Sequence, residues 1–209
     1  MSLFLSRLIL NANHPRAKSE LEHPYELHRT ICHAFENPED ARILFRADTD
    51  RAGEVHVIVQ SLVPPDWGRL KADTKYLMDI DEAKPVELAG LRVGMPLRFR
   101  LRCRPSKRIG EPRNEDLGKR RALRDRDEIF AWLERKAVAS GFEVVEAAFD
   151  RIYWFESKQG KDPKSVGAVQ FDGVLVVTDP DRLREAVRNG IGPQKAYGFG
   201  LLSLAAVRE

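Results

Sequence analysis

Residues 96–104 read PLRFRLRCR, and this stretch decides the fold of the second half of the chain. Apolar side chains and arginines alternate along it with a period of two residues. Such a period predicts a β-strand with one buried face and one open face. The buried face is expected to carry Leu97, Phe99, Leu101 and Cys103, and the open face Arg98, Arg100, Arg102 and Arg104.

The chain after this strand predicts the rest of a small α+β unit. A polar loop at 105–124 leads to a helix at 125–140 with apolar residues at helical spacing. Two apolar stretches, 142–156 and 165–178, are typical of paired strands. A helix at 179–189, ended by Gly190, and a last strand at 198–206 complete the order β-α-β-β-α-β.

The chain before residue 96 predicts the same order of elements. A strand is expected at 2–11 and a helix at 24–35, followed by strands at 41–47 and 54–61. A short helix at 64–70, a weak strand at 75–80 and a linker at 85–94 follow. Two copies of this order predict an α+β fold of two tandem ferredoxin-like domains, at residues 1–88 and 95–209. RNA recognition motifs share this topology, although topology alone does not define function.

Composition limits the class of protein. The chain has 209 residues, and 43% of them are hydrophobic, which favours a folded protein. No apolar run approaches the ~18 residues of a membrane span, and we interpret the short apolar start as a strand, not as a signal peptide. Only two cysteines occur, Cys32 and Cys103, without metal-ligand spacing. We therefore expect a cytoplasmic protein with no membrane partner and no disulfide framework.

Charge is distributed unevenly along the chain. Residues 98–124 hold eleven Lys or Arg and three Asp or Glu, a net charge of +8. The remaining residues hold 24 basic and 29 acidic side chains, a net charge of −5. A localised basic segment on an otherwise acidic protein is typical of a nucleic-acid surface, although a solvated loop balanced by neighbouring acids would look the same.

The helix expected at 24–35 carries the side chains best suited to phosphodiester chemistry. Leu27 and Ile31 are expected to face inward, while Tyr25, His28 and Arg29 are expected on the outward side. Histidine exchanges protons near neutral pH, and arginine binds phosphate through paired donors. An ordinary solvated helix face remains the alternative interpretation.

The sequence predicts neither a metal site nor a cofactor. His23, His28 and His33 are five residues apart, which rotates each by about 140° around a helix, so they cannot converge. Residues 190–203 read GIGPQKAYGFGLLS, where glycines and Lys195 suit close approach to a phosphate backbone. These glycines follow a helix and precede a strand, the reverse of a dinucleotide-binding motif. A tight turn packed for structural reasons is the alternative.

Together these segments resemble the CasE family, the CRISPR-associated endoribonucleases of subtype I-E systems. The resemblance covers nearly the whole chain, and its most specific part is the glycine-rich ending at 190–203. Further matches are the opening strand and the segments at 24–30, 96–102, 131–135 and 174–180.

The resemblance implies an enzyme that binds the stem-loop of CRISPR repeat RNA and cuts once at the 3′ base of the stem. The product is expected to stay bound as the protein joins the other subunits of the Cascade complex. The family's catalytic histidine falls on His28 and its tyrosine on Tyr25, and a basic residue one turn later matches His33. Arg29 is a further catalytic candidate. No metal is needed if the ribose 2′-OH attacks the adjacent phosphate, leaving a 2′,3′-cyclic phosphate and a 5′-OH.

RNA binding is expected from basic residues of the second half and from the groove between the halves. The candidates are Arg98, Arg100, Arg102, Arg104, Lys107, Arg108, Lys119, Arg120, Arg121, Lys158, Lys161, Lys164 and Lys195. The main alternative is a non-catalytic RNA-binding module in which His28 is an ordinary surface residue. A nucleotide-dependent enzyme and a pure scaffold protein are two further alternatives.

Overall fold

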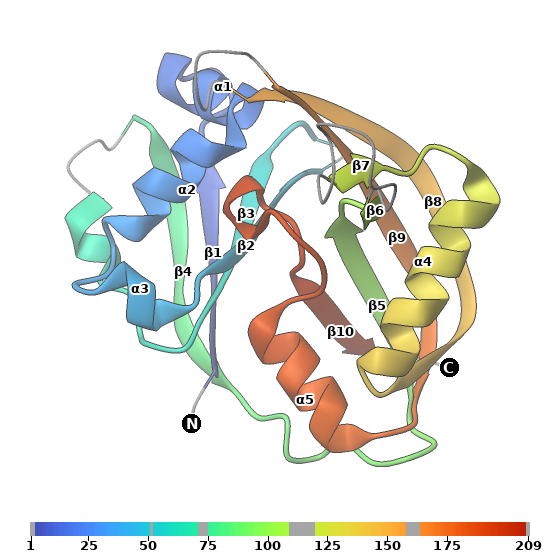
Figure 1. Ribbon diagram of the computed structural model, residues 1–209. Helices are drawn as coiled ribbons and strands as arrows, with labels where there is room; N and C mark the ends of the chain where they lie inside the picture. Colours follow the sequence, from blue (N-terminus) through green and yellow to red (C-terminus); the bar gives the residue numbers. More distant parts are fainter. Residues whose placement is uncertain (1–2, 51, 71–74, 109–119, 158–163, 208–209) are drawn as a thin grey trace.

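The computed structural model describes residues 3–50, 52–70, 75–108, 120–157 and 164–207. For residue 120 and for residues 150–157 and 164–167 it describes only the backbone. Two four-stranded sheets form the body of the protein, and Figure 1 shows helices on one side of each. No helix within these ranges is long and apolar enough to cross a membrane.

The first half contains one four-stranded sheet and the helices that cover it. Its strands are β1 (Leu3–Leu10), β2 (Leu44–Thr49), β3 (Val55–Ser61) and β4 (Leu77–Val86). Its helices are α1 (Pro15–Glu22), α2 (Pro24–Cys32), the short α3 (Pro38–Ala41) and the 3-10 helix η1 (Trp67–Leu70). The strand order is β2-β3-β1-β4, and all neighbours are antiparallel.

The second half repeats this arrangement. Its sheet has the order β10-β5-β9-β8, again with antiparallel neighbours. The strands are β5 (Pro96–Cys103), β8 (Phe142–Ser157), β9 (Lys164–Val177) and β10 (Leu202–Ala206), and the helices are α4 (Arg126–Ala139), α5 (Pro180–Asn189) and the 3-10 helix η2 (Lys195–Tyr197). In both sheets the first strand of the half lies between the third and the fourth. The prediction of two ferredoxin-like folds in tandem is therefore confirmed.

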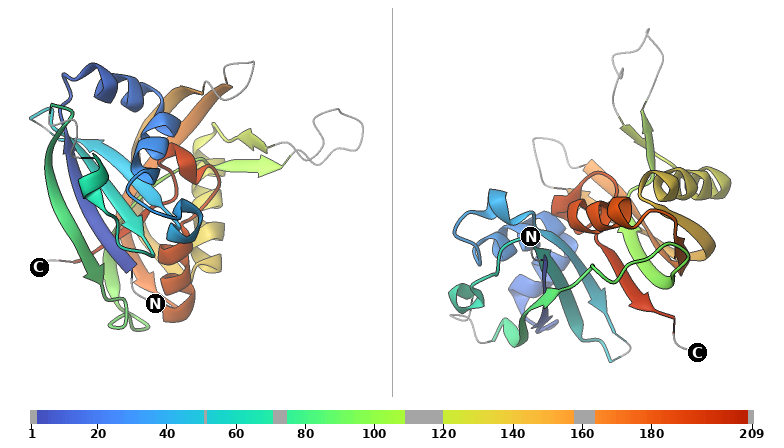
Figure 2. Two further views of the ribbon diagram at one scale, coloured as in Figure 1. Left: turned by 90° about the vertical axis from the view of Figure 1, so that its left-hand side faces the viewer. Right: turned by 90° about the horizontal axis from the view of Figure 1, so that it is seen from below.

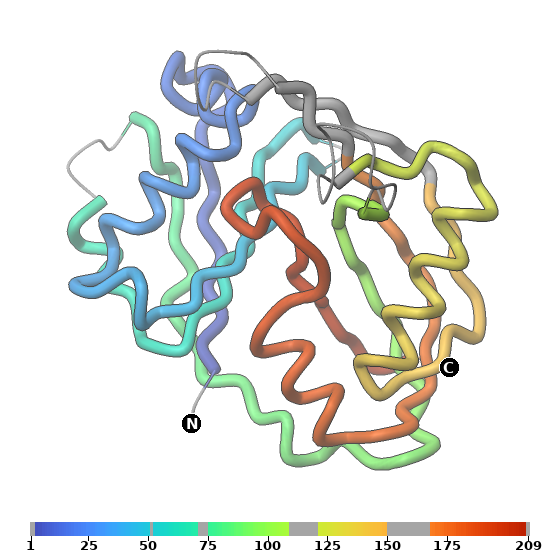
Figure 3. The backbone as a smooth tube through the Cα atoms, viewed as in Figure 1, coloured from blue at the N-terminus to red at the C-terminus, as the bar shows by residue number. Residues whose placement is uncertain are grey.

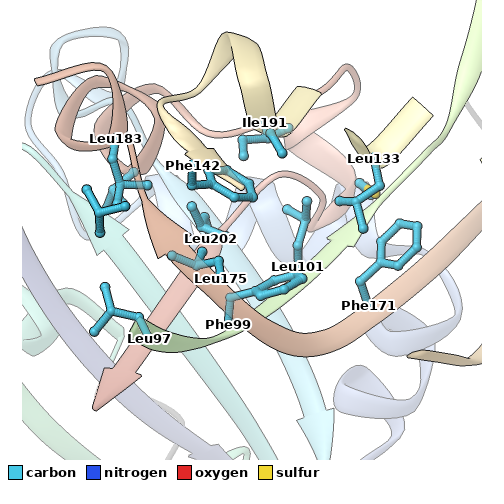
Figure 4. Packing of buried hydrophobic residues seen from close by; sticks show 14 of the residues in the cluster. Leu97, Phe99, Leu101, Leu133, Phe142, Phe171, Leu175, Leu183, Ile191 and Leu202 are labelled. Carbon is cyan, nitrogen blue, oxygen red and sulfur yellow. The ribbon is translucent and has the colours of Figure 1, made fainter. Parts of the chain in front are cut away.

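The apolar side chains that alternate along β5 form the centre of the hydrophobic core of the second half. Its apolar side chains are buried, with Leu101 and Cys103 fully inaccessible to solvent. They pack with Leu133 of α4 and Leu183 of α5, so both helices cover the same face of the sheet (Figure 4; Figure 2, right). Burying each side chain of this size contributes roughly 1.5–3 kcal/mol, which makes this face the main stabilising surface of the half.

Several segments differ from the sequence-based expectations, and three of them have a clear physical reason. Helix α1 was not predicted, because only Ala17 and Glu20 of it are buried and no apolar period marks it. Strand β4 runs to Val86, beyond the predicted 75–80, because its backbone pairs with β1 along the sheet edge. The loop predicted at 105–124 contains a small antiparallel pair, β6 (Ser106–Arg108) with β7 (Arg120–Ala122).

Buried contacts join the two halves. Leu3 of β1 packs into the hydrophobic core of the second half, and Gln60 Nε2 of β3 donates a hydrogen bond to the carbonyl oxygen of Val187 in α5 at 2.8 Å. The chain also crosses back near its end. Figure 3 traces the red segment from α5 towards α2 at η2 and then away again to β10. This crossing brings the glycine-rich stretch of the second half to the first half.

Candidate active site

Helix α2 presents one stripe of polar and aromatic side chains to η2. Pro24 occupies the first turn, where its fixed φ favours helix and its missing N–H costs nothing. Leu27 and Ile31 are buried against the first sheet. Tyr25, His28 and Cys32 are spaced by three and four residues, so they lie along one side of the helix, and all three are half-buried.

The imidazole of His28 lies flat on the ring of Phe45 from β2. The two ring centroids are 5.9 Å apart and the planes differ by 10°. Nε2 lies 3.7 Å from Sγ of Cys32, and the buried Nδ1 has no hydrogen-bond partner. Burial lowers the pKa of His28 below 6.5, so the imidazole is neutral at pH 7. A buried polar atom without a partner is costly, and in native proteins it calls for a specific explanation such as catalysis.

Tyr25 connects His28 to the second half of the protein. Its ring centroid lies 6.2 Å from that of His28 and 5.8 Å from that of Tyr197 in η2. Neither Tyr197 nor Phe45 was predicted as part of the site. The only sequence signal for Tyr197 was an aromatic residue inside the glycine-rich stretch, and nothing in the sequence pointed to Phe45.

Glycines of the stretch 190–203 place η2 against Phe45, the ring that also packs on His28. Gly198 has φ +77°, and a Cβ there would lie 3.2 Å from Cε2 of Phe45, so a larger residue would press on the ring under His28. The turn is also tied to β5, because the N–H of Gly200 donates to the carbonyl oxygen of Arg102 at 2.7 Å. Phe45 thus supports both His28 and the turn.

Lys195 adds positive charge at the same turn. Its pKa is lowered first by burial and then by the nearby charges of Arg42 and Lys136. Within the described part of the chain, none of these three cations forms an ion pair. Unpaired cations that repel one another form a site where an anion such as a phosphate is favoured.

Arg29 lies on a different side of α2 from His28. Its guanidinium forms an exposed ion pair with Glu26 at 3.0 Å. Together with His33 it lines a cavity of about 370 Å³ between α1 and α2, which His28 does not line. The structure therefore brings Tyr25 and His28 together but leaves Arg29 and His33 on the α1 side of the helix.

Two arginines of β5 bind within the protein. Arg102 donates from Nη1 to the carbonyl oxygen of Ala47 at 2.6 Å and from Nη2 to Asp48 Oδ1 at 2.9 Å. It also donates to Gln170 Oε1 at 2.8 Å. Arg100 Nε donates to Asp172 Oδ1 at 2.5 Å. These contacts link β2 of the first half to β5 and β9 of the second.

Asp48 is the centre of this link. Besides Arg102, it accepts a hydrogen bond from Nε of Arg46 at 2.8 Å, and Nη1 of Arg100 lies 4.0 Å away. Arg46 also donates from Nη1 to Oγ of Ser203 in β10 at 2.8 Å. One carboxylate therefore meets three guanidinium groups between the sheets. We name Arg46, Asp48, Arg100 and Arg102 the inter-sheet cluster.

The remaining predicted RNA-binding residues are distributed over several surfaces. Arg98 is exposed at the start of β5, and Arg104 donates a hydrogen bond to Gln194 at 3.1 Å. Lys107, Arg108 and Arg121 are exposed on the β6–β7 pair, where Lys107 forms an ion pair with Glu128 at 2.5 Å. Arg120 and Lys164 are described through their backbones alone, in β7 and β9. Lys119, Lys158 and Lys161 lie outside the described residues.

One group of three potential metal ligands occurs among the described residues. Asp50, Glu54 and His56, at the turn between β2 and β3, have ligand atoms within 4.8 Å of one another. The N–H groups of Ala52 and Glu54 and the His56 ring already bond to Asp50, and the Glu54 N–H is the main cause of its lowered pKa. The turn itself accounts for this arrangement.

Known proteins resemble the chain over nearly its whole length. Residues 3–206 match the CRISPR associated protein family. The chain is 38% identical over 221 residues to the CRISPR-associated endoribonuclease Cse3 of Thermus thermophilus, across 97% of this chain and 100% of that protein. It is 34% identical over 213 residues to the CRISPR system Cascade subunit CasE of Escherichia coli, across 97% of this chain and 99% of that protein.

The structure agrees with these sequence matches. A solved structure of Thermus thermophilus Cse3 bound to an RNA representing a pre-cleavage complex has a TM-score of 0.87 to this chain at 35% identity. The match covers 98% of this chain and 100% of that one. The chain therefore belongs to the CRISPR associated protein family, among its CasE endoribonucleases.

Proposed function

We propose that this chain is a metal-independent endoribonuclease that binds the stem-loop of CRISPR repeat RNA and cuts it once at the 3′ base of the stem. The cut RNA stays bound, and the protein takes its place with the other subunits of a Cascade complex. Its similarity to Cse3 and to the Cascade subunit CasE supports this proposal. The observation that carries it is the half-buried His28, whose Nδ1 has no hydrogen-bond partner and whose ring lies next to Tyr25 where the two halves meet.

The reaction follows from proton transfer by this histidine. The ribose 2′-OH attacks the adjacent phosphorus and gives its proton to the neutral imidazole of His28. The bond from phosphorus to the 5′ oxygen breaks, and that oxygen takes up a proton from water to leave as a 5′-OH, while His28 returns its proton to the solvent. The other product ends in a 2′,3′-cyclic phosphate. The nucleophile is part of the RNA, so no metal is required to activate a water molecule.

Positioning supplies the rest of the rate enhancement. General acid–base catalysis accounts for about 10²–10⁴-fold, and alignment of the 2′-OH with the leaving oxygen must provide much of the remainder. We assign Tyr25 to holding the strand beside His28. Arg29 would balance charge only on RNA that passes over the α1 side of α2, because its guanidinium lies on that side.

RNA binding is proposed for the basic residues that face solvent. Arg98, Lys107, Arg108 and Arg121 are exposed, and Lys195 lies next to the candidate active site. A-form RNA has a narrow major groove, so we expect contacts with phosphates and with the end of the stem. The same role is proposed for Arg104, Lys119, Arg120, Lys158, Lys161 and Lys164. Arg100 and Arg102 are assigned instead to the contact between the sheets.

The proposal also includes the border between the domains and the cellular compartment. We place the border between the domains in residues 89–94, supported by the position of these residues between β4 and β5. We also propose that the protein works in the cytoplasm. Its two thiols, Cys32 and Cys103, are both free, as expected for a reducing compartment.

Cleavage of the cognate repeat hairpin in excess EDTA is expected to proceed at the same rate as in magnesium. Each molecule should be cut once, and the upstream product should carry a 2′,3′-cyclic phosphate that acid opens to a monophosphate. Denaturing gels and mass spectrometry of the products measure both features. Binding without any cleavage would instead indicate an RNA-binding module, and cleavage that stops in EDTA would contradict the proposed chemistry.

The pH dependence of cleavage is expected to show His28 acting as a base. A base must be neutral, and burial lowers the pKa of His28, so the single-turnover rate at subsaturating enzyme should fall with decreasing pH, and only below the usual titration range of a histidine. The stability of the folded protein should also decrease as pH falls. Below pH 6.5 the unfolded chain binds a proton that the folded chain does not, so the free energy of unfolding decreases as pH falls towards the folded-state pKa.

The measurement is a single-turnover pH–rate profile, with enzyme in excess over RNA but below its half-saturating concentration. The variant His56→Gln, which changes another half-buried histidine, should keep the same profile. A rate that falls as pH rises, starting below pH 6.5, would instead make His28 the general acid.

A further inference from the structure

Tyr197 is the aromatic residue that the second half contributes to the His28 site. Its half-buried ring lies 5.8 Å from the ring of Tyr25, with the planes at 35°. Tyr25 in turn lies 6.2 Å from His28. Three rings from two halves of the chain therefore follow one another, and Tyr197 is the one that the second half contributes.

The ring of Tyr197 is held in place by the fold. Its N–H donates to the carbonyl oxygen of Gln194 at 3.0 Å, and the N–H of Gly198 donates to that of Lys195 at 3.0 Å, so the turn is closed on itself. The side chain packs against the fully buried pair Ala168 and Phe199. A ring fixed in this way offers contact area at little entropic cost on binding.

Lys195 lies two residues before Tyr197 on the same turn. Arg42 and Lys136 are close enough to act on its charge, and none of the three forms an ion pair among the described residues. One turn thus presents an aromatic ring together with cations. Proteins that hold single-stranded RNA combine these two features, with the ring under a base and the cations on the backbone.

We propose that Tyr197 is a substrate-positioning residue on which the base of the first unpaired nucleotide 3′ of the cut is stacked. This inference rests on the proposed function. The nucleotide 5′ of the cut ends the stem, so its base is already paired and stacked. The nucleotide after the stem is unpaired and has a free face for the ring. Because this nucleotide carries the leaving 5′ oxygen, holding its base keeps that oxygen in line with the 2′-OH.

A double comparison of protein and RNA tests this proposal. On the intact hairpin, Tyr197→Ala is expected to lower the single-turnover rate at subsaturating enzyme by about 5- to 150-fold, the range for one base stacked on one ring. Tyr197→Phe keeps the π-face and should stay within about twofold of the wild type. On a hairpin with an abasic site at the first unpaired nucleotide 3′ of the cut, wild type and Tyr197→Ala should cut equally slowly.

The same loss with Tyr197→Ala on intact and abasic RNA would overturn the proposal, because the ring would then act only within the protein. Thermal unfolding of both variants shows whether either is misfolded. A second measurement does not depend on cleavage. It records the fluorescence of 2-aminopurine placed at the same nucleotide, in RNA bound to the His28→Ala variant. The fluorescence should be quenched in this complex, and the double variant with both His28→Ala and Tyr197→Ala should relieve the quenching. Equal fluorescence with the single and the double variant would reject the stacking even if the wild type never cuts RNA. If the quenching is relieved but the wild type does not cut RNA, only the proposed function is rejected.

Discussion

His28→Ala is expected to lower the single-turnover rate of hairpin cleavage by about 10²–10⁴-fold, the usual contribution of general acid–base catalysis. RNA affinity should change little, because the imidazole is half-buried and uncharged at pH 7 and contributes no charge to phosphate binding. Rapid-quench cleavage measures the rate, and a filter-binding titration in EDTA measures the affinity.

Two further variants separate chemistry from packing at this position. His28→Phe keeps a flat ring on Phe45, whose centroid is 5.9 Å from that of the imidazole, but it cannot transfer a proton. It should be as inactive as His28→Ala and more stable. His56→Gln, outside the site, should cut at the wild-type rate. If His28→Phe cut at more than a tenth of the wild-type rate, His28 could not be the main proton acceptor.

Asp48→Ala is expected to reduce the free energy of unfolding by about 3 kcal/mol, because it leaves buried arginines without their carboxylate. The side chains of Arg46 and Arg102 are only 6% and 11% exposed. Water therefore cannot replace the lost partner. The value lies at the lower end of the range for broken buried pairs, since Asp48 itself is 21% exposed. The melting temperature should fall by about 6–12 °C, as judged by thermal unfolding.

Asp81→Ala provides the matched control. Asp81 pairs with Arg7 at 2.7 Å, but these side chains are 47% and 44% exposed. Loss of an exposed pair costs at most about 1 kcal/mol, so this variant should melt close to the wild type. Asp48→Ala should also cut RNA more slowly at temperatures where it is still folded, because the inter-sheet cluster links β2, which carries Phe45 next to His28, to β5, to which the glycine-rich turn is hydrogen-bonded. Equal melting of the two variants would mean that the cluster does not hold the sheets together.

Local periodicity determined most of the secondary structure. The alternation at 96–104 predicted β5 and its buried face, because a strand places successive side chains on opposite sides whatever surrounds it. The same reasoning failed for α1, whose one buried polar residue, Glu20, bonds to Thr30 and Tyr76 instead of packing as an apolar residue would. A buried glutamate that accepts hydrogen bonds does not contribute to an apolar period in the sequence.

In the candidate site too, the sequence predicted some positions and the packing of the helices and sheets decided others. Tyr25 and His28 could be placed together from the sequence, because they are one helical turn apart. Arg29 is adjacent to His28 in the chain, yet it lines the cavity on the α1 side, and its position depended on how α1 packs. The predicted role of the β5 arginines also depended on what covers the open face of that sheet.

By itself, the sequence determined two ferredoxin-like folds in tandem, a basic second half, a histidine helix and a glycine-rich ending that resembles the CasE family. Only the tertiary structure decided that Arg102 meets Asp48, that Phe45 lies under His28, and that Tyr197 lies beside Tyr25. Periodicity is a property of neighbours in the chain, whereas these contacts join residues far apart in it. They form only when two separately covered sheets pack against each other, and many sequences with the same local pattern could pack them differently.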